Sequence, residues 1–201
     1  KASVPPLLLR FVYEKARGNP FFIQELLDTL SETGAVTVNR HIAIVNGTLS
    51  AFDLPSTLQG LVQARIDRLS ETDKLLLKVA SVTGIQFSVR LLAESLPIPL
   101  LYGELLERLR TLEDRDFIRL EAPEPDLTYV FKHAITQEVT YQSLPFAQRL
   151  QLHQAVGNAL QEAQPDSIER LAYHFGSSGD TQRAWYYLMA AAHKTSREYA
   201  N

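Results

Sequence analysis

Apolar residues recur at helical spacing along most of this 201-residue chain, which predicts a mainly helical protein. The first two predicted helices span residues 7–17 and 20–33, with Gly18 and Asn19 between them. Glycine can adopt the left-handed conformation that ends a helix, asparagine caps a helix N-terminus, and proline suits the first helical turn. The order Gly18, Asn19, Pro20 therefore predicts that one helix ends and the next begins here.

A small β-hairpin is predicted after the second helix. Two short apolar segments, residues 35–38 and 41–45, predict its strands. Residues 46–50 are rich in turn-forming types and mark a seam between subdomains. We therefore expect a first domain over residues 1–50, made of helices and this hairpin.

The middle of the chain changes from a helical to a strand-like pattern. Ser70, with Asp73 three residues later, resembles a capping box, which predicts a helix start. Three helices followed by two strands is the order of a winged helix, and we expect that fold over about residues 70–133 of a second domain, residues 51–133. The expected elements are a leading helix at 54–69, helices from 70, at 88–96 and at 101–112, and strands at 117–120 and 128–131.

From Ile135 onward the pattern predicts only helices, with breaks near 164–166 and 176–180. Apolar residues around the second break follow the spacing of a tetratricopeptide-like (TPR-like) helix–turn–helix unit. We expect a helical connector over residues 134–166 and the start of TPR-like repeats over residues 167–201. The residues that follow this spacing are Leu171, Ala172, Phe175, Gly179, Asp180, Ala184, Leu188, Ala191 and Ala192.

A single repeat of this kind cannot cover both of its apolar faces, so further repeats are expected after it. The chain starts at Lys1 rather than at methionine, and it stops at Asn201 within a predicted helix. We therefore expect these residues to be a piece of a longer polypeptide.

Residues 18–26, Gly-Asn-Pro-Phe-Phe-Ile-Gln-Glu-Leu, resemble the GNPFF-hydrophobic-x-EL signature of the STAND branch of AAA-type signalling ATPases. In that family the motif lies in the helical lid, and its proline packs against the adenine of the bound nucleotide. The resemblance implies this contact for Pro20 in the full-length protein. The sequence contains no phosphate-binding loop (P-loop), so the resemblance also implies a P-loop domain elsewhere in the same polypeptide.

A second segment, residues 131–144, resembles the one that follows the winged helix in STAND ATPases related to cyclase-linked and regulator-linked members. His133 matches the histidine of the motif written MHD in better-studied relatives. There the histidine reaches the β-phosphate of ADP and holds the lid and the winged helix closed, and the resemblance implies the same for His133. Ala134 stands where that motif has aspartate, a departure that bears on any carboxylate-dependent part of the switch.

Both motifs also have a structural interpretation. Gly18, Asn19 and Pro20 are explained by helix punctuation alone. A histidine at a helix start, such as His133, can cap backbone groups or fill a polar gap. Each residue taken alone favours the structural interpretation, whereas the two motifs in their expected order favour the nucleotide interpretation.

Composition and charge exclude several classes of function. Cysteine is absent, so there is no disulfide framework and no thiolate nucleophile or ligand. The histidines lack metal-ligand spacing, and we expect no metal site and no catalytic activity in these residues. Residues 102–120 carry four arginines against five acidic residues, a balance that argues against DNA as a partner. No apolar stretch approaches the roughly 20 residues of a membrane span, and we expect a cytoplasmic protein.

The resemblance implies the regulatory part of a nucleotide-switched signal-transduction ATPase: the lid, the winged helix and the start of a sensor. ATP or ADP is the implied cofactor of the full-length protein, with none expected for this piece alone. The implied partners are the P-loop domain of the same polypeptide and a protein or small-molecule signal at the repeats. The effector domain stays open between cyclase, kinase and transcription factor. The alternatives are a stand-alone interaction scaffold and a DNA-binding winged-helix regulator.

Overall fold

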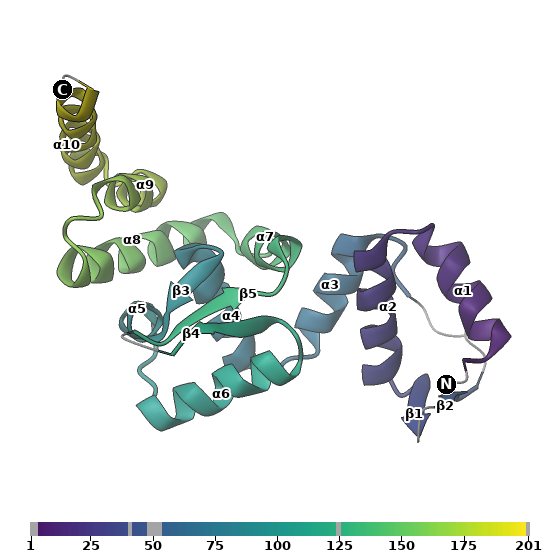
Figure 1. Cartoon of the computed structure of the whole chain (residues 1–201). Helices are drawn as coiled ribbons and strands as arrows, with labels where there is room; N and C mark the ends of the chain where they lie inside the picture. Colours follow the sequence, from purple (N-terminus) through teal and green to yellow (C-terminus); the bar gives the residue numbers. More distant parts are fainter. Residues whose placement is uncertain (1–3, 40–41, 48–53, 124–125, 200–201) are drawn as a thin grey trace. The chain divides into compact units, whose positions relative to one another are not determined.

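The computed structural model divides the chain into two compact units, Lys1–Leu69 (unit 1) and Ser70–Asn201 (unit 2), and each is described by itself. Figure 1 shows their helices and strands. The protein is mainly helical with small antiparallel sheets, as the sequence predicts. None of the helices in the described residues has the length and apolar character needed to cross a membrane. The structure describes residues 4–39, 42–47, 54–123 and 126–199.

Some predicted features extend outside these ranges. They are the start of the second hairpin strand at His41, part of the linker at 48–50, the turn between the last two strands at 124–125, and the chain end at 200–201.

Unit 1 contains helices α1, α2 and α3 and a β-hairpin of strands β1 and β2. Arg17 and Gly18 adopt the left-handed conformation at the end of α1, with φ values of 47° and 83°. The next helix begins at Pro20 with Asn19 as its N-cap, so the predicted helix end and helix start are both confirmed. The elements are α1 (Pro6–Ala16), α2 (Pro20–Glu32), β1 (Val36–Asn39), β2 (Ile42–Val45) and α3 (Leu58–Asp67).

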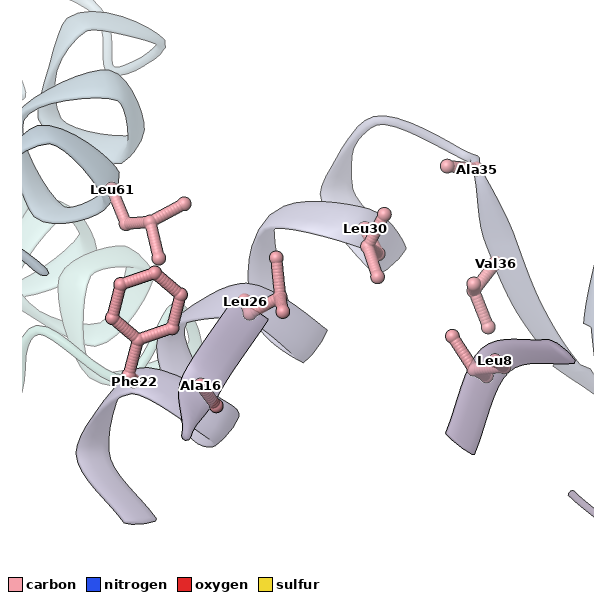
Figure 2. Close-up of a cluster of buried hydrophobic side chains, with 8 residues drawn as sticks. All are labelled: Leu8, Ala16, Phe22, Leu26, Leu30, Ala35, Val36 and Leu61. Carbon is pink, nitrogen blue, oxygen red and sulfur yellow. The ribbon is translucent and has the colours of Figure 1, made fainter. Parts of the chain in front are cut away.

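The core of unit 1 is formed by side chains from its three helices and the start of β1 (Figure 2). Phe22 of α2 points toward Leu61 of α3 in Figure 2. Positions four residues apart share one face of a helix, which is why α2 buries every fourth residue from Phe22. The apolar residues Phe21 and Leu27 of the same helix lie outside this buried face, because they are 49% and 39% exposed. The core residues are Leu8, Ala16, Phe22, Leu26, Leu30, Ala35, Val36 and Leu61.

Helix α3 begins later than the predicted start at residue 54. Thr57 keeps an extended backbone, with φ −117° and ψ 152°, and its side chain accepts a hydrogen bond from the Gly60 N–H at 3.1 Å. Threonine is a good N-cap because its hydroxyl satisfies one of the unpaired N–H groups of the first turn. The helix therefore starts at Leu58.

The first half of unit 2 combines α4, α5 and α6 with a three-stranded antiparallel sheet in the order β3-β5-β4. The sequence predicts β4 and β5 but not β3, which has only three residues and pairs with β5 through Phe87 opposite Tyr129. So short a strand shows too little alternation to be recognised. The elements are α4 (Glu71–Thr83), β3 (Gln86–Ser88), α5 (Val89–Ser95), α6 (Tyr102–Asp114), β4 (Ile118–Ala122) and β5 (Thr128–Phe131).

The predicted helix start at Ser70 is confirmed. The Ser70 hydroxyl accepts a hydrogen bond from the Asp73 N–H at 3.2 Å and donates one to the Asp73 carboxylate at 2.6 Å. Asp73 also pairs with Arg108 of α6 at 3.3 Å. The cap thus links the start of α4 to α6.

The second half of unit 2 is helical, as predicted, but it contains a break at residues 143–145 that the sequence analysis missed. Pro145 has no N–H and disfavours a helical conformation for the preceding residue. The Arg149 side chain then donates to the carbonyls of Gln142 and Leu144, at 2.8 and 2.9 Å, and satisfies the end of α7. The elements are α7 (Ala134–Gln142), α8 (Phe146–Ala163), α9 (Ile168–Ser178) and α10 (Thr181–Tyr199).

Helices α9 and α10 form an antiparallel hairpin around the turn at Gly179. Lys194, near the end of α10, pairs with Glu169, at the start of α9, at 3.4 Å. Phe175 is fully buried and stacks on Tyr187, with ring centroids 5.6 Å apart. Of the apolar positions in the predicted repeat spacing, Leu171, Ala172, Phe175 and Ala184 are buried, whereas Leu188 is 53% exposed.

Candidate functional site

Pro20, the predicted contact for the adenine, lies at the exposed start of α2 in unit 1. The Asn19 side chain fixes this turn, because its Oδ1 accepts hydrogen bonds from the N–H groups of Phe21 and Phe22 at 3.0 and 3.3 Å. Phe22 is buried in the core, while Pro20 and Phe21 keep exposed surface. The cap therefore presents a proline and an aromatic ring at one fixed turn.

His133, the predicted contact for the phosphate, lies between β5 and α7 in unit 2. It has an extended backbone, with φ −135° and ψ 136°, and its carbonyl accepts the Thr136 N–H at 3.0 Å. Its side chain makes no capping hydrogen bond to the helix, so the capping role in the structural interpretation does not apply to it. The residue is half-buried at the point where the sheet ends and the helical part begins.

Pro20 and His133 belong to different units, so the structure describes each by itself. Their joint action on one nucleotide stays a prediction.

The acidic residues at the end of α6 have structural roles. Glu113 accepts the Leu120 N–H at 2.8 Å, and Asp116 pairs with Lys132 at 2.7 Å. Asp116 also has a left-handed backbone, with φ 61°, in the turn before β4. Within the described ranges, no three histidine or carboxylate side chains are grouped as a metal ion would require.

Unit 1 contains a buried ionic cluster that the sequence analysis did not find. Arg65 of α3 is 3% exposed and contacts three carboxylates of α2: Glu25 at 2.8 Å, Glu32 at 3.1 Å and Asp28 at 3.4 Å. Burial lowers the pKa of Arg65, but the attraction of the carboxylates outweighs it and the net shift is upward. The cluster joins α2, which starts at Pro20, to α3.

Unit 2 contains a second buried polar cluster, formed by His153 of α8, His174 of α9 and Tyr141 of α7. The two histidines contact each other through their Nδ1 atoms at 3.0 Å, and the Tyr141 hydroxyl contacts His153 Nε2 at 3.0 Å. The sequence does not predict this contact, because His153 and His174 are 21 residues apart in the chain. One available signal is that both lie among apolar residues at helical spacing, which indicates a buried position.

Burial keeps both histidines neutral at neutral pH. It lowers the pKa of His153 to about 4, with a smaller contribution from the positive charge of Arg149. It lowers the pKa of His174 to about 3, helped by His153 and by Arg170. In the neutral pair one Nδ1 donates and the other accepts, so the proton arrangement of one ring fixes that of the other.

Comparison with known proteins adds one match. A family model described as a domain of unknown function (DUF8739) matches residues 1–43, which include the turn at Pro20. No curated protein matches the chain.

Proposed function

We propose that this chain is the regulatory part of a nucleotide-switched signal-transduction ATPase of the STAND class. In this proposal residues 1–50 form the helical lid, residues 70–133 form a winged helix, and the hairpin of α9 and α10 is the first TPR-like repeat of a sensor. The P-loop domain belongs to the same polypeptide, in the cytoplasm. Sensing at the repeats biases the protein between an ADP-bound closed and an ATP-bound open arrangement.

The observation that carries the proposal is the position of His133. It follows three helices and an antiparallel sheet in the order β3-β5-β4, an arrangement that supports the winged-helix assignment. His133 comes shortly after the end of β5 and is the N-cap residue of helix α7. A ligand that contacts His133 would therefore act on the sheet and on the following helices together.

The exposed turn at Pro20 supports the same proposal. A base can pack only against a residue whose surface is accessible, and Pro20 and Phe21 keep theirs. The Asn19 hydrogen bonds hold the turn in one conformation, which lowers the entropic cost of binding. No catalytic role is proposed for these residues, since the P-loop chemistry would come from the other domain.

The ion pairs of α6 and β4 disfavour the DNA-binding alternative. Arg108 pairs with Asp73 and Glu104, at 3.3 and 3.0 Å, so it is not available to phosphates. Arg119 pairs with Glu121 at 3.1 Å. A salt-dependent shift of duplex DNA by the chain would contradict this part of the proposal.

The interaction-scaffold alternative is favoured by the exposed apolar and aromatic side chains of α10. Trp185 and Tyr186 are 66% and 67% exposed, and Leu188 and Met189 are also exposed. The two functions predict different parent genes, because only the ATPase requires a P-loop sequence upstream of these residues.

The test uses the polypeptide that joins the P-loop domain to this chain. His133→Ala should raise the dissociation constant for ADP about tenfold or more, the effect of losing one hydrogen bond to a charged group. Pro20→Ala should weaken ADP binding by less, and His193→Ala, an exposed position on α10, should leave it unchanged. The 201 residues alone should show no ADP binding in calorimetry. Micromolar binding by them, or equal ADP affinity in all three variants, would refute the proposal.

A further inference from the structure

A hollow of about 320 Å³ lies between the end of α4, helix α7 and helix α9, all within unit 2. It is called here the α9 hollow, and its volume is at the lower end of the roughly 300–1,000 Å³ typical of ligand sites. Its lining includes one carboxylate and one guanidinium, those of Glu169 and Arg170, and both residues are exposed. One exposed charge of each sign gives the hollow no preference for an anion or a cation. Recognition there therefore depends on the uncharged groups of the lining.

His174 is the member of the buried histidine pair that lines this hollow, and it is only 2% exposed. Its Nδ1 contacts His153 at 3.0 Å. No group of the described residues pairs with its other ring nitrogen, Nε2, and that atom is not sealed in the interior. Buried polar groups are normally paired, so a buried ring with an open nitrogen at the wall of a hollow is suited to hold a ligand by a hydrogen bond.

Tyr141 lines the same hollow and stands at the other end of a hydrogen-bonded series, Tyr141–His153–His174. A neutral imidazole has one donor nitrogen and one acceptor nitrogen. If the Tyr141 hydroxyl donates to His153, then His153 donates to His174, and His174 Nε2 is left as a donor. If the series runs the other way, His174 Nε2 is left as an acceptor and the Tyr141 proton is free to be donated.

In either direction the two ends of the series offer one donor and one acceptor. In the first direction the donor is His174 Nε2 and the acceptor is the Tyr141 oxygen, and in the second the roles are exchanged. The neighbouring Tyr173 also lines the hollow, and its hydroxyl can take the Tyr141 proton and offer its own instead. The hollow therefore matches a ligand group that has a donor and an acceptor side by side.

We propose that the α9 hollow binds a small uncharged molecule through an amide group, open or within a ring, with the amide N–H and C=O on His174 and Tyr141. An amide carries one acceptor beside its donor, so it satisfies both ends in either direction of the series. The ligand contacts α7 and α9 at the same time, so its binding stabilises the packing of these helices. This inference goes beyond the proposed nucleotide switch and does not depend on it.

The test is an NMR titration of the 201-residue chain with benzamide. Amide signals of residues 81–84 and 169–174 should shift in a saturable way, with a dissociation constant in the millimolar range, as expected for a ligand of about nine non-hydrogen atoms. Acetophenone has the same ring and carbonyl but no N–H, and it should bind at least about fivefold more weakly. Benzoate and benzylamine, an anion and a cation at neutral pH, should also bind more weakly than benzamide.

Tyr141→Phe keeps the ring and removes one end of the series. It should lower the affinity for benzamide about three- to tenfold and leave that for acetophenone nearly unchanged. Tyr102→Phe is the matched control, because Tyr102 is an exposed tyrosine of α6 outside the hollow, and it should bind benzamide with unchanged affinity.

Nitrogen-15 spectra of the imidazole rings test the series without any substitution. His153 and His174 should be neutral and opposite tautomers, one protonated at Nδ1 and the other at Nε2. The proposal is overturned if both rings have the same tautomer or if benzamide gives no saturable shifts at these residues. It is equally overturned if acetophenone or benzoate binds as tightly as benzamide, or if Tyr102→Phe weakens binding as much as Tyr141→Phe.

Discussion

The buried polar clusters of the two units solve the same physical problem in opposite ways. In unit 1, Arg65 is buried with its charge, and the carboxylates of Glu25, Asp28 and Glu32 compensate it. In unit 2, His153 and His174 are buried without charge, because burial lowers the pKa of each ring to about 4 and about 3. The first cluster is stable while its opposite charges remain paired. The second is stable while both histidines remain neutral.

The two clusters should respond differently to substitution and to acid. Removing one partner of a buried ion pair leaves an uncompensated charge, which is more damaging than the loss of the pair itself. A fold that buries a neutral histidine is destabilised by acid instead, because the histidine binds a proton more readily in the unfolded chain than in the folded one. Substitution should therefore affect unit 1 most, and pH should affect unit 2 most.

The largest expected effect is that of Arg65→Met, which leaves the buried carboxylate of Glu25 without a cation. It should destabilise unit 1 by about 3–5 kcal/mol. Arg68→Met is the control, because Arg68 pairs with Glu32 at 3.1 Å but keeps a 34% exposed side chain, and it should cost about 1 kcal/mol or less. Urea unfolding followed by hydrogen exchange of the amides of α2 and α3 measures both. Equal effects of the two substitutions would show that burial of Arg65 carries no special cost.

The second effect is a loss of stability of unit 2 in acid. Each histidine has a lower pKa in the folded than in the unfolded state, so the unfolded state binds more protons between the two values. Stability is complete above about pH 6.5 and falls as the pH drops toward 4, by up to about 1.4 kcal/mol per pH unit for each ring. Between pH 6.5 and 5 we expect a loss of about 2–4 kcal/mol. Unfolding followed by the fluorescence of Trp185, the only tryptophan in the sequence, measures it.

His153→Gln should roughly halve this pH dependence, because it removes one titrating ring. His193→Gln should leave it unchanged, since His193 lies on the exposed side of α10. A pH dependence of undiminished size in His153→Gln would mean that other groups cause the acid sensitivity.

The smallest effect tests how closely the helices around the histidine cluster are packed. Gly157 of α8 faces Phe175 of α9, and an added Cβ would lie 2.9 Å from the ring. Gly157→Ala should therefore destabilise unit 2 by about 1–3 kcal/mol, although alanine is the better helix former. Gly176→Ala is the control, because its Cβ would meet Ala184 at an ordinary 4.0 Å. It should be neutral or stabilising in the same unfolding measurement, and a similar loss in both would argue against close packing at Phe175.

The elements that the sequence predicts well are those with local causes. The turn at Gly18, Asn19 and Pro20 and the helix start at Ser70 each depend on residues within three positions of one another. The break at Pro145 has a local cause as well, but apolar residues continue at helical spacing on both sides and concealed it. Strand β3 was missed because its three residues show too little alternation, and because its pairing partner β5 lies about 40 residues further along the chain.

The residues of the candidate site also fall into those with a local sequence signal and those without one. The sequence singles out Pro20 and His133 by motif, and the structure places one on an exposed turn and the other between a strand and a helix. Neither Arg65 nor the histidine pair carries a recognisable motif. In the sequence, Arg65 is only one polar residue in a helix with apolar residues. Whether it forms buried ion pairs depends on which side chains surround it in the fold.

The sequence by itself determined the mainly helical character of the protein, the capped ends of its helices and the two strands of each predicted pair. Those features follow from hydrogen bonds and steric preferences within a few residues. Only the tertiary structure decided which charges and rings meet: Glu25 with Arg65 across 40 residues, and His153 with His174 across 21. Contacts at such separations depend on how the helices pack against one another. Apolar periodicity does not determine this packing, because many pairings of helices bury the same apolar faces.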